Sequence, residues 1–378
     1  MAKVDFSIVA IARRENRYVE EWLNYHFGIG FNRIYLYDNP GPGDADLSFL
    51  KESYEGRLVL THIAGEGRQS GAYKHFIDNF KQETEWVAFL DLDEFIVLNE
   101  DKTVPRFIGR YGHIGSIAIS WLMFGHSGHH TRPNGLILDN YTWRYPFCFS
   151  QIKTLCRVGC VDNIVSIHNV NGKAVLINGF DLKGLDRIPP HSNLCDYNRA
   201  LDTTSVLSIH HYFSRSLEDV DHKIARGSAA GTVGRNLDWF LNKKEVFGST
   251  IDLTLPKFIR SGKSWLQKDA YIYFENRIEQ DGQTFSHVIP GDWDGEWYHG
   301  FYPDLRDRTF DQESMKEHFR TKGAFEGRCW NQKTWNERFF DPRVYLGLHE
   351  DLKTAGYDAE AAMAHYFLSG RFEGRQIF

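Results

Sequence analysis

The sequence is poor in cysteine. Its five cysteines include no CxxC pair; they are Cys148, Cys156, Cys160, Cys195 and Cys329. This spacing argues against a zinc framework, and the odd number argues against a disulfide scaffold. We therefore expect reduced thiols and a cytoplasmic location.

The sequence also lacks an excess of positive charge and a long hydrophobic run. The formal net charge is −6, which argues against a chain-wide attraction to nucleic acid or anionic membrane. No nucleic-acid partner is expected. A polyanionic ligand would have to be bound by a local group of basic residues. The apolar run at 5–12 is too short for a signal peptide or a membrane span. We expect no transmembrane segment, which leaves peripheral membrane contact open.

Strand and helix patterns alternate along the first part of the chain. Runs rich in β-formers at 5–12, 33–39, 57–63 and 86–90 are interleaved with helical patterns at 19–27 and 70–80. This order predicts an α/β fold with a mostly parallel sheet flanked by helices. Further strands are expected at 116–124, 135–144 and 153–161. A capping box at Ser216 predicts a helix that ends at Gly227.

The C-terminal part contains an internal repeat. Residues from about 301 match those from about 348 at an offset of 47, including His318 with His365 and Gly323 with Gly370. Each copy predicts a small helical hairpin. Two copies are fewer than a solenoid needs, so we expect them to pack on the rest of the chain or on a second copy, as in a homo-oligomer. The predicted domains are 1–230 (α/β), 231–290 (helical extension and linker) and 291–378 (two helical-hairpin repeats).

Two carboxylates interrupt the apolar run "WVAFLDLDEFIVL" at 86–98. Asp91 and Asp93 follow a strand directly, and ligands bind at the carboxyl ends of strands in open α/β sheets. Oxygen ligands of this kind suit Mg²⁺ or Mn²⁺, which take water and phosphate oxygens as their other ligands. Such an ion stabilises a diphosphate that leaves a sugar carbon.

Several blocks of the sequence together resemble a known family. They are "AIARRENRYVEEWLNYHFGIGFNRIYLYDN", "WVAFLDLDEFIVL", "SWLMFGHSGH" and "HHYFSRSLEDVDHKIARG". Their order over about residues 5–230 resembles glycosyltransferases of the GT-A fold, of the family 2 and family 92 (DUF23-like) kind. The resemblance implies a Rossmann-like, nucleotide-sugar-binding domain.

The resemblance also implies roles for individual residues. It assigns nucleoside binding to Ala12, Arg13, Asn16 and Asp38, and binding of the metal and the donor diphosphate to Asp91 and Asp93. A downstream histidine often completes the metal site in this fold, and the spacing favours His211 over His210. Further candidates for contact with phosphate or acceptor are Arg68, Lys74 and Lys153.

The predicted site has several candidates for the catalytic base. An inverting transferase needs a carboxylate or a histidine that takes the proton of the acceptor hydroxyl. Asp181 and Asp186 lie between the paired aspartates and His211, and His126 or His168 could substitute. The predicted activity is metal-dependent transfer of a hexose, with galactose as the first candidate, from a UDP-sugar to a hydroxyl of a glycan, polysaccharide or lipid-linked acceptor. The resemblance implies inversion.

Two alternatives belong to other classes of protein. Haloacid dehalogenase-like phosphatases also place a DxD after an apolar strand, but they usually have Thr or Val where this chain has Phe95. Their expected "GDxxxD" is matched only loosely by "GDWDGE" at 291–296. The other alternative is a non-catalytic interaction protein with C-terminal repeats. The intact Asp91 and Asp93 argue against it.

Overall fold

The structure is a computed structural model that describes two compact units. It describes residues 3–41, 43–189, 201–227, 236, 240, 250–281, 289, 291–306, 309–323, 328–340, 342–370, 373 and 375. The first unit comprises residues 1–248 and 253–284, and the second comprises residues 249–252 and 285–378. Much of 231–249 and 282–288 lies outside the described residues, so the domain boundaries near 230 and 290 stay predictions.

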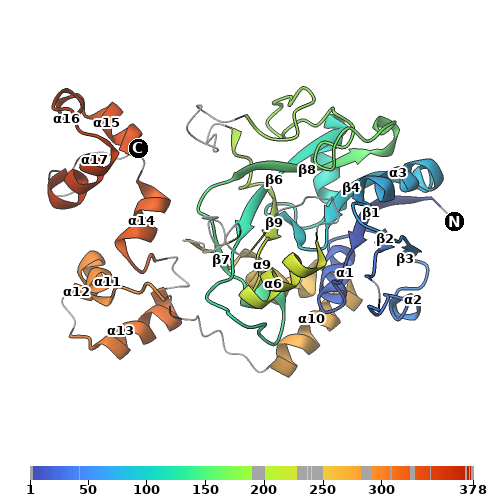
Figure 1. The fold of residues 1–378 in the computed structure, drawn as a ribbon, viewed down its shortest axis with the longest axis horizontal. Helices are drawn as coiled ribbons and strands as arrows, with labels where there is room; N and C mark the ends of the chain where they lie inside the picture. The colour runs from blue at the N-terminus through green and yellow to red at the C-terminus, as the bar shows by residue number, and fades with distance from the viewer. Residues whose placement is uncertain are drawn as a thin grey trace. The chain divides into compact units, whose positions relative to one another are not determined.

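The first unit is built on a curled mixed sheet (Figure 1). Its strands are β1 (Val4–Ala12), β2 (Arg33–Asp38), β3 (Leu58–His62), β4 (Thr84–Asp91), β5 (Glu94–Leu98), β6 (Ser116–Phe124), β7 (Trp143–Arg144), β8 (Phe149–Arg157) and β9 (Leu207–Tyr212). They follow the order β7-β6-β8-β4-β1-β2-β3, with β9 paired to both β6 and β5. The predicted α/β class is confirmed. Strands β3-β2-β1-β4 are parallel, whereas β8 is antiparallel to both β4 and β6.

Helices cover both faces of this sheet. They are α1 (Val19–Gly28), α2 (Leu50–Ser53), α3 (Gln69–Asn79), α4 (Val104–Tyr111), α5 (Ile137–Asn140), α6 (Leu217–Arg226), α9 (Thr254–Arg260) and α10 (Lys268–Asp281). Alternate residues of β1 point to opposite faces, as the period of two in a strand requires. Ile8 and Ala10 enter the core that contains α1, and Val9 and Ile11 enter the core that contains α3.

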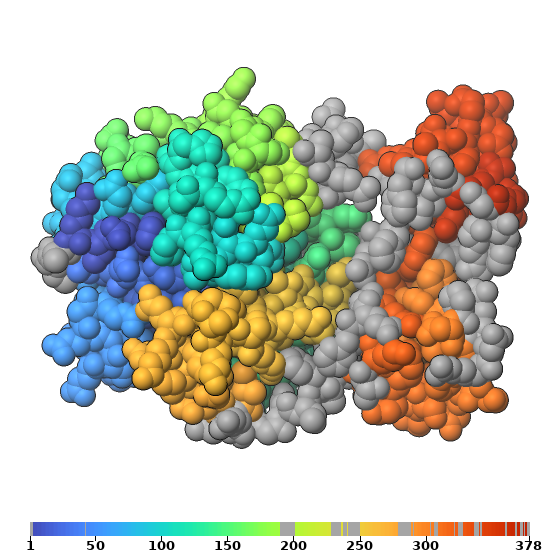
Figure 2. Space-filling view, turned by 180° about the vertical axis from the view of Figure 1, so that it is seen from behind, coloured from blue at the N-terminus to red at the C-terminus, as the bar shows by residue number. Residues whose placement is uncertain are grey.

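Helix α10 packs directly on α1. In α1, a Cβ at Gly28 would lie 2.8 Å from Leu266 and 2.9 Å from the Cβ of Ala270, so only glycine allows this close approach. The space-filling view shows the segment around α10, in gold, beside the blue N-terminal part of the chain (Figure 2). None of the described helices combines the length and the apolar character that crossing a membrane requires.

The strand expected at 135–144 is wrong for most of its length. The chain forms the short helix α5 and only two strand residues, Trp143 and Arg144. The buried Glu21 carboxyl group accepts the backbone N–H groups of Ile137 and Leu138, at 2.8 and 3.0 Å. These donors lie at the start of α5, where the first helical N–H groups have no partner within the helix. A distant side chain therefore favours the helical turn.

The second unit repeats its helices at the predicted offset of 47. Its elements are β10 (Thr250–Ile251), α11 (Gly295–Phe301), α12 (Pro303–Arg306), α13 (Gln312–His318), η6 (Phe319–Gly323), α14 (Gln332–Phe339), α15 (Pro342–Leu348), α16 (Glu350–Thr354), α17 (Ala359–His365) and η7 (Tyr366–Gly370). The predicted C-terminal helices are therefore present. The tyrosine–histidine hydrogen bond recurs as well, since Tyr298 pairs with His318 at 3.1 Å and Tyr345 with His365 at 3.0 Å.

Candidate functional site

The two predicted aspartates lie at the carboxyl end of β4. Asp91 is the last residue of the strand, and Asp93 follows in the turn that leads into β5. Leu92 between them is 3% exposed and belongs to the hydrophobic core. Leu92 is thus anchored in the core, while Asp91 and Asp93 contact polar side chains from other elements.

Asp91 is held by two polar side chains from other elements. Its Oδ1 accepts a hydrogen bond from Gln69 Nε2 at 2.5 Å, and its Oδ2 lies 3.0 Å from Lys153 Nζ. Lys153 is completely buried and also lies 3.7 Å from Glu94. Burial alone would favour a neutral amine, but the Asp91 and Glu94 carboxylates hold the pKa of Lys153 above its ordinary value. Lys153 is thus a charged anchor for Asp91.

Glu94 is a buried carboxyl group beside this pair. Its Oε2 accepts the backbone N–H of Asp91 at 3.0 Å, and it is 0% exposed. Burial raises the pKa of Glu94 well above its ordinary value, although Lys153 acts in the opposite direction. Glu94 therefore stabilises the turn of the paired aspartates by accepting this backbone hydrogen bond.

Asp93 faces His211 and Lys223, which come from β9 and α6. Its Oδ1 lies 3.5 Å from His211 Nε2, and its Oδ2 lies 2.5 Å from Lys223 Nζ. Burial disfavours the carboxylate, but Lys223 and then His211 lower the pKa of Asp93 well below its ordinary value. Asp93 is therefore ionised at neutral pH.

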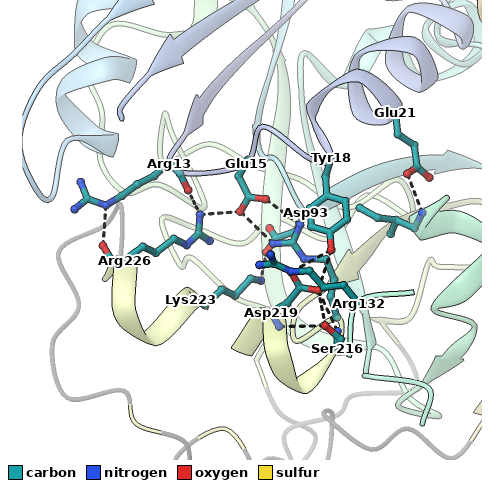
Figure 3. A network of polar contacts seen from close by, with 12 residues as sticks. Arg13, Glu15, Tyr18, Glu21, Asp93, Arg132, Ser216, Asp219, Lys223 and Arg226 are labelled. Atoms are coloured by element: carbon teal, nitrogen blue, oxygen red, sulfur yellow. Dashed lines mark hydrogen bonds and ion pairs between the residues drawn. The ribbon is translucent and has the colours of Figure 1, made fainter. Parts of the chain in front are cut away.

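The beginning of α6 is fixed by a buried hydrogen-bond network. Ser216 and Asp219 form the predicted capping box. Asp219 also accepts hydrogen bonds from the Tyr18 hydroxyl at 2.9 Å and from Arg132 Nε at 2.8 Å. Because these contacts fix the first turn of α6, they also fix the direction in which Lys223 projects from the next turns (Figure 3).

A second carboxylate, Glu15, forms ion pairs with two arginines near Asp93. Glu15 accepts two hydrogen bonds from Arg215, at 2.9 and 3.1 Å, and lies 2.7 Å from Arg226. Arg226 also bonds to the backbone carbonyl of Arg13, while Arg13 Nε donates to the carbonyl of Arg226 at 2.9 Å. Figure 3 shows this chain of contacts between the end of β1 and α6. Four basic side chains therefore lie close together here, namely Arg13, Arg215, Arg226 and Lys223, where an anionic ligand would find partners.

Three of the four residues predicted to bind the nucleoside lie at or next to the carboxyl ends of β1 and β2, namely Ala12, Arg13 and Asp38. Ala12 and Asp38 are direct partners in the register of β1 and β2, and Arg13 donates to the side chain of Asn39 at 2.8 Å. Asp38 Oδ2 accepts the N–H of Leu47 at 3.0 Å. Asn16 instead bonds to the carbonyl of Ala45 at 3.1 Å, in the loop that follows β2.

The other predicted donor or acceptor residues are dispersed. Arg68 bonds to the carbonyl of Ala64 at 2.8 Å. Lys74 lies on an exposed face of α3, 3.1 Å from Asp78. Lys153 is too deeply buried to contact a ligand directly and acts on Asp91 instead.

The predicted bases Asp181 and Asp186 lie in the loop after β8. Asp181 accepts the backbone N–H of Lys183 at 2.8 Å, and Asp186 lies 3.5 Å from Arg187 with a side chain that is 45% exposed. The alternative His126 is buried, and its Nδ1 accepts the N–H of Gly128 at 2.9 Å.

The fit of the site to a divalent ion depends on two protein ligands. Among the described residues, no group of three or more His, Cys, Asp or Glu side chains is arranged to hold a metal. The Asp91 oxygens contact Gln69 and Lys153, and the role of Asp91 as a metal ligand stays a prediction. Asp93 Oδ1 and His211 Nε2 face each other at 3.5 Å. This pair fits an ion that takes its remaining ligands from phosphate and water, as Mg²⁺ commonly does.

Several residues of this site are absent from the set predicted from the sequence. They are Glu15, Gln69, Glu94, Arg215, Lys223 and Arg226. Two of them could have been found in the motif "HKIAR" after the capping box. Lys223 and Arg226 are three residues apart there, so they lie on the same face of the predicted helix. The roles of Glu15 and Arg215 have no local signal, because they are 200 residues apart and become partners only in the fold.

Comparison with known proteins supports the resemblance in the N-terminal part. Residues 12–154 match the model of glycosyltransferase family 92. A family 92 protein of Oryza sativa subsp. japonica is 27% identical over 142 residues, which are 36% of this chain and 24% of that protein. One of Ricinus communis is 27% identical over 146 residues, 37% of this chain and 26% of that protein. The matched stretch thus spans about a quarter of these relatives, and the resemblance is confirmed there.

Solved structures give weaker similarities. S. aureus TarS 1-349 has a TM-score of 0.28 and 18% identity and covers 42% of this chain and 48% of that chain. The same protein in complex with UDP has a TM-score of 0.28, 17% identity and the same coverage. These TM-scores are too low to support an argument about fold or function.

Proposed function

We propose that this chain is a glycosyltransferase that moves a hexose from a UDP-hexose to a hydroxyl of a glycan, polysaccharide or lipid-linked acceptor. The observation that carries the proposal is the arrangement around Asp93, where His211 and Lys223 meet the carboxylate at the carboxyl edge of the sheet. The family 92 match includes Asp91 and Asp93. An open α/β sheet binds ligands at this edge.

The cationic side chains explain why a diphosphate suits the site. Lys223 donates to Asp93 itself, and Arg226, about one turn further along α6, bonds to the backbone carbonyl of Arg13. When the bond from the sugar carbon to phosphate breaks, negative charge develops on the leaving diphosphate. Fixed positive charges beside it lower the barrier. A Mn²⁺ or Mg²⁺ ion held by Asp93 and His211 would supply further stabilisation of that charge.

A donor screen tests this proposal. Purified protein is incubated with UDP-galactose, UDP-glucose and UDP-N-acetylglucosamine in the presence of Mn²⁺ or Mg²⁺, with and without sugar acceptors, and UDP release is measured. A transferase releases UDP from one donor, slowly with water and faster with an acceptor. Hydrolysis of simple phosphomonoesters alone would indicate a phosphatase, and no turnover of either substrate would favour an interaction protein. The anomeric configuration of the product tests inversion.

The repeat region has a separate proposed role in assembly or acceptor docking. Its two copies have the same tyrosine–histidine pair and the same helix order, which supports a module that forms by repetition. Removing residues after 296 should change the oligomeric state or the acceptor KM while donor hydrolysis persists. If neither quantity changes, this role is wrong. A cytoplasmic location and peripheral membrane contact also stay proposals, which fractionation of cells tests.

A further inference from the structure

His168 has a fixed tautomer beside the residues of the proposed donor site. Its Nδ1 lies 3.1 Å from the backbone carbonyl oxygen of Ile152. A carbonyl oxygen only accepts hydrogen bonds, so Nδ1 carries the proton and Nε2 has a free lone pair. Nε2 makes no hydrogen bond within the described part of the chain. The ring is thus oriented like a general base, with the accepting nitrogen available.

Trp121 connects His168 to the proposed donor site. Its indole ring packs edge-on against His168, with centroids 5.3 Å apart, and against His211, with centroids 4.4 Å apart. His211 in turn faces Asp93. His168 and His211 therefore contact one indole ring, so that the proposed base lies one side chain away from the proposed donor-binding residues.

The backbone around His168 is anchored, which keeps the ring in place. The carbonyl of His168 accepts a hydrogen bond from Thr154 Oγ1 at 2.6 Å, and its N–H donates to Ser166 Oγ at 3.1 Å. Thr154 belongs to β8, the strand that also carries Lys153. A catalytic side chain needs such support, because small displacements of a reacting group are costly.

We infer that His168 is the general base of the transfer reaction. The inference rests on the proposed function and names one residue for it. His168 Nε2 takes the proton of the acceptor hydroxyl as the acceptor oxygen forms its bond to the anomeric carbon. The bond from that carbon to the diphosphate oxygen breaks, and its electron pair leaves with the diphosphate. Water can serve as the acceptor in the same step.

The charges around His168 are compatible with this role. Burial and then Lys153 lower the pKa of His168, Asp91 and Asp186 raise it, and the net effect is a pKa of about 4. The imidazole is therefore neutral at pH 7 and able to accept a proton. Asp186, itself a predicted base, is near enough to stabilise the imidazolium that forms. Its side chain is 45% exposed and suits this supporting role.

The experiment compares His168→Asn with a matched control. An Asn side chain keeps an N–H donor for the Ile152 carbonyl but has no basic nitrogen. His113 makes the same kind of contact, Nδ1 to the carbonyl of Arg110 at 3.1 Å, at an exposed position, so His113→Asn is the control. UDP release from UDP-galactose and UDP-glucose with water as acceptor gives kcat and KM, and calorimetry gives the affinity for UDP.

The expected result is a 10²–10⁴-fold fall in kcat for His168→Asn, with unchanged UDP affinity and unchanged turnover by His113→Asn. Added imidazole should restore part of the activity of His168→Ala. Full turnover by His168→Asn, or loss of turnover only in Asp186→Asn, would overturn the inference while leaving the proposed function intact. A wild-type protein that releases no UDP from either donor would contradict the proposed function and the inference with it.

Discussion

Replacing Glu15 by glutamine removes the carboxylate that neutralises two arginines near the proposed donor site. Glu15 and Arg215 have side chains that are 5% and 3% exposed and form a double hydrogen bond, and Arg226 contacts the same carboxylate. Glu15→Gln removes the carboxylate that forms the double hydrogen bond with the buried Arg215. Breaking a buried pair in this way costs about 3–5 kcal/mol, which corresponds to a fall in Tm of about 10 °C for a unit of this size.

The assay is thermal and denaturant unfolding of Glu15→Gln and of a matched control, Glu85→Gln. Glu85 contacts Lys3 at 2.8 Å and Arg157 at 3.1 Å, but its side chain is 42% exposed. Glu85→Gln should therefore cost at most about 1 kcal/mol. Equal losses of stability in Glu15→Gln and Glu85→Gln would refute the reasoning, because burial would then make no difference to these ion pairs.

Three further substitutions test other parts of the structure. Burial raises the pKa of Glu21 from 4.5 to about 8, so the folded state retains a proton that the unfolded chain releases; stability should fall as pH rises from about 4.5 to 8. The free energy of unfolding, measured at several pH values, should change less steeply with pH in Glu21→Gln than in the wild type. Equal slopes for the two proteins would contradict this. In the repeat, a Cβ at Gly323 would overlap the Tyr298 hydroxyl, so Gly323→Ala should cost about 1–3 kcal/mol. The control Gly300→Ala, which meets nothing within 4 Å in α11, should be neutral or stabilising. Lys223→Met should weaken UDP binding by about tenfold or more, because a charged hydrogen bond contributes about 1.5–3 kcal/mol; unchanged affinity in calorimetry would exclude this role.

The N-terminal half of the fold follows from local patterns. The alternation of Ile8, Val9, Ala10 and Ile11 between two cores is visible in the sequence as a continuous apolar run. A strand covered on both faces requires such a run. The error at 135–144 has a different origin, because Glu21 reaches α5 from a helix more than a hundred residues away. Such a contact leaves no local signal.

The sequence also identifies part of the candidate site, but only its local part. Asp91 and Asp93 stand out because they interrupt an apolar run, whereas Lys223 becomes a partner of Asp93 only when α6 folds back over 130 residues. Lys153 reaches Asp91 because β8 inserts between β4 and β6, a strand order that periodicity does not encode. The roles of these residues in catalysis stay predictions.

The most direct measurement is UDP release from a UDP-hexose by the wild-type protein and by Asp93→Asn, side by side and with Mn²⁺ present. Asn keeps the size of the side chain but removes the charge that faces His211 and Lys223. The proposed donor site predicts turnover by the wild type and a loss of at least about 10²-fold in Asp93→Asn, with unchanged circular dichroism. Equal turnover by the two proteins would contradict it.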